Sequence, residues 1–117
     1  MVTDAGLPEV REYKGLTTLA LGNTKITDAG LQELKGLTHL AILNIEATEV
    51  TDSGLKNLKE LKSLASLYVG GTKVTDAGLM ELAPLKNLTT LSLIGTKVTD
   101  AGVAAFKKAV PKCEVVR

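Results

Sequence analysis

The sequence predicts an α/β solenoid in which one short strand and one short helix alternate in every repeat. The segment Thr-Asp-Ala-Gly-Leu recurs, with small changes, every 24 residues. In each full repeat, a segment of alternating aliphatic residues precedes Thr-Asp-Ala-Gly-Leu. Aliphatic residues spaced three apart follow most copies of this motif. A fixed period of this length is typical of arrays whose units bury their apolar sides against one another. The five copies begin at Thr3, Thr27, Thr51, Thr75 and Thr99.

The first half of each repeat is predicted to be a strand with one buried face. Leu19 points inward, Ala20 outward and Leu21 inward, because side chains alternate along a strand. Constant register between repeats makes neighbouring strands parallel. The pattern is Leu16-x-x-Leu19-x-Leu21-x-x-Thr24-x-Ile26, and it returns from Leu40, Leu64 and Leu88.

The second half is predicted to be a short α-helix or 3₁₀ turn. Leu31, Leu34 and Leu37 recur every three residues, which keeps one side of such a helix against the core. Thr27 or Asp28 is expected to cap its free N–H groups. The aspartates recur singly, one per repeat, so capping is favoured over a calcium site, which needs several converging oxygens. They are Asp4, Asp28, Asp52, Asp76 and Asp100.

This pattern resembles the leucine-rich repeat family, whose motif is L-x-x-L-x-L-x-x-N/C-x-L. The resemblance implies a right-handed, curved solenoid with a parallel sheet on the concave face and short α or 3₁₀ helices on the convex face. The Ile/Val-Thr-Asp segment is similar to the cysteine-containing subfamily and to bacterial repeat proteins of the TDAGL type. The family usually has Asn or Cys where this chain has Thr, and a Thr hydroxyl is expected to serve part of that role. These positions are Thr24, Thr48, Thr72 and Thr96.

We expect one domain spanning residues 1–117. Leu7, Val10 and Tyr13 align with Leu31, Leu34 and Leu37, so the chain starts partway through a unit. Either it is cut out of a longer array, or the half-repeat is a natural cap. The strand near Leu19 is then an open edge through which the chain could self-associate. After Pro111 ends the last helix, residues 113–116 are expected to form a fifth strand. The units are a half-repeat at 3–15, full repeats at 16–39, 40–63 and 64–87, and a last repeat with its cap at 88–117.

Composition limits the partners and the location that can be expected for this chain. A net charge of +1 gives no reason to expect nucleic acid as a partner. The lysine columns, including Lys25, Lys73 and Lys97, are interpreted as a solvated face. We expect no membrane segment. The single cysteine, Cys113, favours a reducing, cytoplasmic location.

Chemistry is sparse in this sequence. With one Cys and one His, no zinc site of the usual spacing can be built, and no cofactor is expected. His39 is predicted to be an exposed loop residue with no nucleophile at motif spacing. Cys113 is predicted to be a small, half-buried residue of the last strand. We therefore expect a protein without enzymatic activity.

The concave face is the candidate partner-binding surface. Tyr68 is its expected central anchor, because Tyr is enriched at interface hot spots. Ile42 and Ile94 lie one repeat away on either side, although scattered exposed apolar residues are also ordinary on protein surfaces. The candidate residues are Thr18, Ala20, Ile42, Asn44, Glu46, Ser66, Tyr68, Thr90, Ser92 and Ile94.

Two functions are compatible with these features. The first is a protein-interaction scaffold that binds its partner on the concave face. The alternative is a structural section of a longer array, or a designed or consensus-like repeat protein, which mainly packs on neighbouring repeats or on itself.

Overall fold

Five parallel strands form one sheet in the computed structural model, which describes residues 3–117. Neighbouring strands pair one repeat apart, so Leu19, Leu43, Leu67 and Leu91 are adjacent rungs and Val115 extends the row. The predicted register and the predicted fifth strand are therefore confirmed. In sheet order the strands are β1 (Thr18–Ala20), β2 (Ile42–Asn44), β3 (Ser66–Tyr68), β4 (Thr90–Ser92) and β5 (Glu114–Val116).

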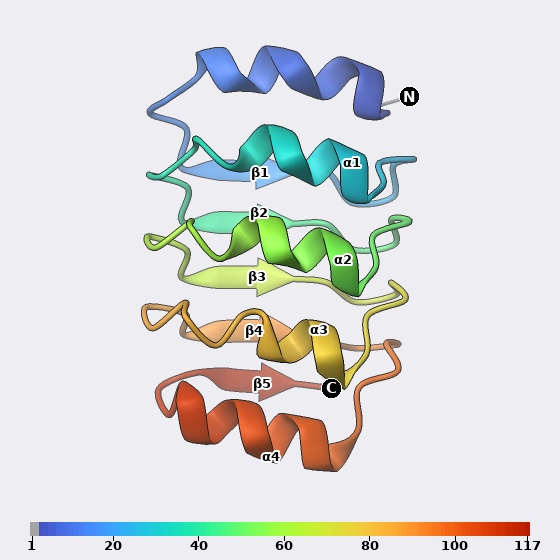
Figure 1. Ribbon diagram of the computed structural model, residues 1–117, viewed down its shortest axis with the longest axis vertical. Coiled ribbons are helices and arrows are strands. Elements are labelled where there is room, and N and C mark those ends of the chain that lie inside the picture. The colour runs from blue at the N-terminus through green and yellow to red at the C-terminus, as the bar shows by residue number, and fades with distance from the viewer. Residues whose placement is uncertain (1–2) are drawn as a thin grey trace.

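The helices cover one face of this sheet (Figure 1). Both expected helix types occur, since two of the α-helices continue directly into a 3₁₀ turn. In Figure 1 the column of helices extends beyond the column of strands at both ends, as in a stack that curves with its sheet inside. The helices are η1 (Asp4–Glu12), α1 (Asp28–Leu31), η2 (Gln32–Leu34), α2 (Asp52–Leu55), η3 (Lys56–Leu58), α3 (Asp76–Met80) and α4 (Asp100–Ala109).

An aliphatic core fills the space between sheet and helices. The predicted core leucines of the first full repeat, Leu31, Leu34 and Leu37, are completely buried. Phe106 of α4 is the only buried aromatic residue in the described part of the chain. Tyr13 aligns in sequence with the buried Leu37 but does not share its environment, because the Tyr13 side chain is 63% exposed. It lies at the end of the stack, where no further repeat in the described chain covers it.

The threonine column bonds within its own repeat. Thr48 Oγ1 donates to the carbonyl of Ile45 at 2.8 Å, and Thr24, Thr72 and Thr96 make the same bond at 2.7 Å. The acceptor lies three residues earlier, directly after the strand. The hydroxyl thus satisfies a carbonyl at the strand exit of its own unit, whereas the Asn of the family was expected to bond to adjacent turns.

The aspartates join consecutive repeats. Asp28 Oδ1 accepts a hydrogen bond from the Thr51 N–H at 2.7 Å, and Asp28 Oδ2 accepts one from Thr51 Oγ1 at 2.5 Å. The same two bonds form in the other interfaces, and we call the whole series the Asp–Thr ladder. Its further rungs are Asp4–Thr27, Asp52–Thr75 and Asp76–Thr99.

The expectation that these aspartates cap their own helices is therefore wrong. Threonine does the capping in two repeats: Thr27 Oγ1 accepts from the Ala29 N–H, and Thr99 Oγ1 accepts from the Gly102 N–H. Thr51 and Thr75 make no such cap. The sequence predicts that each carboxylate accepts hydrogen bonds from the free N–H groups of its own helix. In the structure each carboxylate accepts them from the threonine of the next repeat.

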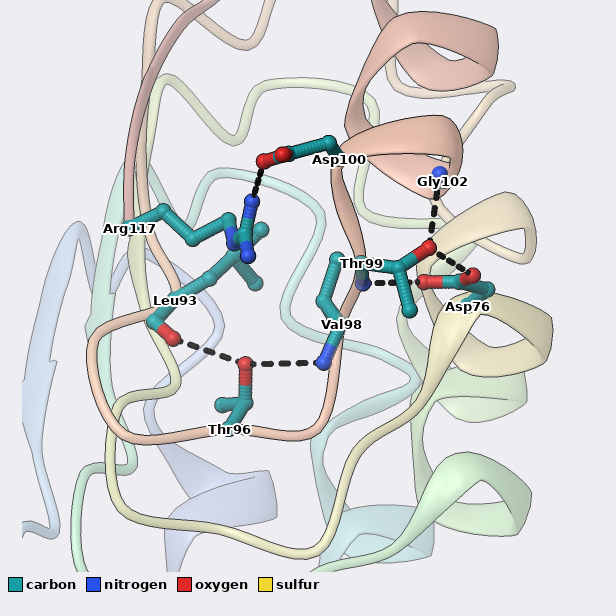
Figure 2. A network of polar contacts seen from close by, with 8 residues as sticks. All are labelled: Asp76, Leu93, Thr96, Val98, Thr99, Asp100, Gly102 and Arg117. Atoms are coloured by element: carbon teal, nitrogen blue, oxygen red, sulfur yellow. Dashed lines mark hydrogen bonds and ion pairs between the residues drawn. The ribbon is translucent and has the colours of Figure 1, made fainter.

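The last rung is shown in Figure 2. The hydrogen bond from the Thr99 hydroxyl, then that from the Thr99 N–H, lowers the pKa of Asp76 below its usual 3.8, and Arg117 adds to this. Burial opposes the shift. A carboxyl group with a lowered pKa stabilises the fold above its unfolded-state pKa, and this contribution is lost as the pH falls through the folded-state value.

The glycine of the motif makes room for the ladder. A Cβ atom at Gly54 would lie 2.3 Å from Asp28 Oδ1, and the corresponding distances at Gly30, Gly78 and Gly102 are 2.1–2.2 Å. Real Cβ atoms essentially never approach so closely, so a side chain here displaces the carboxylate. At Gly6, nothing among the described residues lies within 4 Å of such a Cβ atom.

The strand exits use left-handed backbone at equivalent positions. Asn23 has a φ of 58°, Gly71 of 67° and Gly95 of 77°. Ala47 adopts the same conformation with a φ of 52°, which is unfavourable for an L-residue with a Cβ. The repeat therefore imposes its turn on a residue that does not prefer it.

We expect Gly54→Ala to lower the free energy of unfolding by about 1–3 kcal/mol, because the methyl group displaces Asp28 from Thr51. Gly6→Ala is the matched control and should be neutral or stabilising by up to about 1 kcal/mol. Urea denaturation measures both. Asp28→Ala, alone and combined with Gly54→Ala, completes a double-mutant cycle with a coupling of at least about 0.5 kcal/mol. Equal effects of Gly54→Ala and Gly6→Ala would contradict the steric role.

We expect Ala47→Gly to raise the free energy of unfolding by about 1 kcal/mol, since it removes left-handed strain. Gly71→Ala is the matched reverse change. Its Cβ would meet Ala47 only at ordinary contact distances of 3.6 Å, so strain alone should destabilise it by a similar amount. Urea denaturation of both variants tests this, and the expectation fails if the two changes have the same sign.

Candidate functional site

The concave face is the face of the sheet turned away from the helices. Strand alternation brings the ten predicted residues to it, in rows set by the register. One row crosses Thr18, Ile42, Ser66 and Thr90, and the next crosses Ala20, Asn44, Tyr68 and Ser92. Glu46 and Ile94 follow the ends of β2 and β4.

Three large apolar residues lie on a diagonal across this face. Tyr68 is half-buried, and its direct neighbours in the register are Asn44 and Ser92. Ile42 precedes Asn44 by two residues and is 41% exposed, whereas Ile94 follows Ser92 by two and is 55% exposed. Strand geometry puts each step of this diagonal at about 8 Å between Cα atoms. The three residues, Ile42, Tyr68 and Ile94, are called the apolar diagonal below.

An ordered polar pair borders the apolar diagonal. The Glu46 N–H donates to Asn44 Oδ1 at 2.9 Å, and Asn44 Nδ2 donates to Glu46 Oε1 at 3.3 Å. Glu46 Oε2 lies 3.2 Å from the place of a Cβ atom at Gly70, so the absence of a side chain there leaves space for the carboxylate. The pair thus holds an acceptor next to the strand that carries Tyr68.

The prediction that Ser92 is available to a partner is wrong, because the structure buries it to 6% exposure. Its register neighbours are Tyr68 on β3 and Val116 on β5, and these larger side chains flank the small hydroxymethyl group. Ser66 and Thr90 are half-buried, while Thr18 and Ala20 are exposed on the edge strand. The accessible part of the face therefore centres on the apolar diagonal.

A shallow hollow of about 360 Å³ adjoins the face at the strand exits. Its walls come from the turns that contain Asn23, Ala47 and Gly71, together with Thr24, Thr48, Lys25 and Glu49. Asn23, Ala47 and Gly71 have left-handed backbone, which the aliphatic pattern does not encode. One lysine and one glutamate are its charged residues, and they do not form an arrangement of nucleophile and base.

Cys113 and His39 lie outside the five strands. The expectation of a half-buried Cys113 within the last strand is wrong, because this residue precedes β5 and is only 1% exposed. Burial raises the pKa of its thiol to about 11, although Lys107 opposes this shift. His39 is exposed, as predicted. Among residues 3–117 no three His, Cys, Asp or Glu side chains are grouped to hold a metal ion.

We expect the Cys113 thiol to resist alkylation by iodoacetamide at pH 8 in the folded protein. With a pKa of about 11, only about one thiol in a thousand is ionised at this pH, and the thiolate is the nucleophile. The same chain in concentrated urea is the control, since an unfolded thiol has a pKa near 8.5. Mass spectrometry over time gives both rates, and equal rates would rule out the protected thiol.

Comparisons with known proteins agree with this architecture. A sequence model described as Leucine Rich repeat matches residues 16–35, 60–83 and 85–107, which is more than half of the chain. No curated protein sequence matches significantly. Within residues 3–117, every helix is too short or too polar to cross a bilayer.

Solved structures with the same fold include two internalins of Listeria monocytogenes. Internalin C2 is 29% identical over 95% of this chain and 45% of its own, with a TM-score of 0.80. Internalin InlF is 24% identical over 93% and 36%, with a TM-score of 0.59. The chain thus spans less than half the length of these internalin structures. Leiomodin-1 actin-binding site 2 is 15% identical over 93% and 75%, with a TM-score of 0.74.

The last two similarities concern the fold alone, and the assignment to the cysteine-containing subfamily stays a prediction. The strand register, the helices on one face and the matched sequence segments lead to one conclusion. The chain belongs to the leucine-rich repeat family.

Proposed function

We propose that this chain is a non-catalytic scaffold that binds a protein partner on its concave face. The apolar diagonal is the observation that carries the proposal. It places two exposed isoleucines on either side of a tyrosine, and its members come from three neighbouring strands. A partner that covers it removes apolar surface from water, which is the main favourable term in most protein association.

Tyr68 is suited to the role of anchor. Because it is already half-buried between neighbouring strands, little side-chain freedom remains to be lost on binding. Tyrosine combines an apolar ring with a hydroxyl group, which is why it is common in the centres of interfaces. The leiomodin-1 segment, which has the same fold, is named as an actin-binding site, and this supports protein binding in general by analogy of the fold.

Glu46 sets the chemistry at the border of the proposed interface. Its carboxylate is oriented by Asn44 rather than by a cationic side chain. A lysine, arginine or amide donor on the partner would complete its hydrogen bonding. We therefore propose a partner with an apolar ridge and a donor group beside it.

A second candidate is structural: the chain packs against further repeats, either in a longer array or in another copy. The two ends of the stack favour it, since side chains that are fully buried inside the stack are only half-buried there. We also propose a cytoplasmic location, which the single, buried Cys113 thiol supports.

Tyr68→Ala and Ile42→Ser should each weaken capture of the concave-face partner, Tyr68→Ala by about 2 kcal/mol, or roughly 30-fold. The assay is a pull-down from lysate of the source cells, followed by titration of the captured protein. Met80→Ser is the matched control, because Met80 is 42% exposed and lies on helix α3 at the opposite face. Thermal unfolding checks that all variants fold. If binding is unchanged by both concave substitutions, the partner uses another surface.

A further inference from the structure

The two ends of the stack expose the margins of the core. Among residues 3–117, six hydrophobic residues pack against the core while only partly buried, and each lies at one of the two ends of the stack. Their equivalents in interior repeats, such as Leu34, Leu43 and Leu91, are fully buried. At the first end, formed by η1 and β1, the six include Val10, Leu16 and Leu19; at the last end, formed by α4 and β5, they include Val103, Ala109 and Val115.

The first end has the threonine and the glycine of an Asp–Thr rung, but residues 3–117 supply no aspartate for it. In the interior, each motif glycine lies under an aspartate that also accepts two hydrogen bonds from the motif threonine. Gly6 and Thr3 repeat these two positions. Thr3 has the same extended backbone as Thr27, and no described atom lies within 4 Å of a Cβ at Gly6. The glycine therefore leaves room for a carboxylate that residues 3–117 do not supply.

The last end carries the other half. Asp100 is the final member of the aspartate series, and its side chain is 97% exposed. It bonds to Arg117 rather than to a threonine (Figure 2). Val103 beside it occupies the position of Leu31, whose side chain reaches to within 3.2 Å of a Cβ at Gly54 in the interior.

Charge also matches between the two ends. Between the first unit and the next, Arg11 of η1 forms an ion pair with Glu33 of η2. Lys107 in the last unit has the repeat position of Arg11, and Glu9 in the first unit has that of Glu33. Lys107 and Glu9 are both exposed and opposite in charge.

We propose that the last end of one copy docks on the first end of a second copy, head to tail. β5 then pairs in parallel with β1 of the second copy, so that Val115 lies beside Leu19. Asp100 accepts hydrogen bonds from Thr3 over Gly6, after Arg117 releases one carboxylate oxygen. The contact continues the interface that already joins each repeat to the next. It specifies the partner of the second, structural candidate and does not depend on binding at the concave face.

A head-to-tail dimer leaves one free end on each of its two copies, so further copies can add and the assembly is open rather than closed. The mass measured by light scattering should rise steadily with concentration, without a plateau at the dimer. Gly6→Leu fills the carboxylate space at one end, and Asp100→Ala removes the carboxylate at the other. Each change should weaken association at least tenfold. A Cβ atom at residue 6 would meet no described atom within 4 Å, and circular dichroism confirms folding of both variants.

Mixing the two variants gives the decisive result. The Gly6→Leu protein keeps an intact last end and the Asp100→Ala protein an intact first end, so together they should form a 1:1 dimer and nothing larger. Tyr68→Ala, which changes only the concave face, should leave association unchanged and so separates this proposal from the concave-face proposal. A monomer at millimolar concentration, association that ignores both end variants, or a mixture that stays monomeric would each overturn the inference.

Discussion

The Asp–Thr ladder is the contact on which the arrangement of this molecule depends. Burial of leucines drives the stack together, but the hydrophobic effect has no direction and tolerates sliding of one layer on the next. A carboxylate that receives both the N–H and the hydroxyl of one threonine has a single geometry. It fixes each helix against the following one, and the motif glycine is the space that this requires. Strand register and side-chain rows then follow.

Much of the fold could be predicted because the controlling pattern is local and repeated. The alternation at Leu19 to Leu21 indicates strands, and the 24-residue period alone aligns Leu19 with Leu43. The destination of Asp28 could not be predicted, because capping of the adjacent helix and bonding to Thr51 are equally compatible with the sequence. The spacing shows which residues recur, but it does not show from which neighbouring donor a carboxylate accepts its hydrogen bonds.

The site was predicted less completely, and the reasons are geometric. Strand parity placed Ile42, Tyr68 and Ile94 on one face, and the 24-residue period that pairs Tyr68 with Asn44 also sets their diagonal order. The burial of Ser92 depends on Val116 beside it, and the exposure of Tyr13 on what covers the end of the stack. Each error concerns a residue whose surroundings come from another unit.

The threonine column has a consequence for how such a chain can change in length. The Thr48 hydroxyl bonds only to a carbonyl of its own unit, and each aspartate reaches only one unit ahead. No described polar side-chain contact in the interior skips a neighbour. Removal or duplication of one whole unit therefore rebuilds every such bond at the new junction, whereas a single inserted residue would disrupt one. The unit is interchangeable, and evolution can lengthen or shorten the array in whole steps.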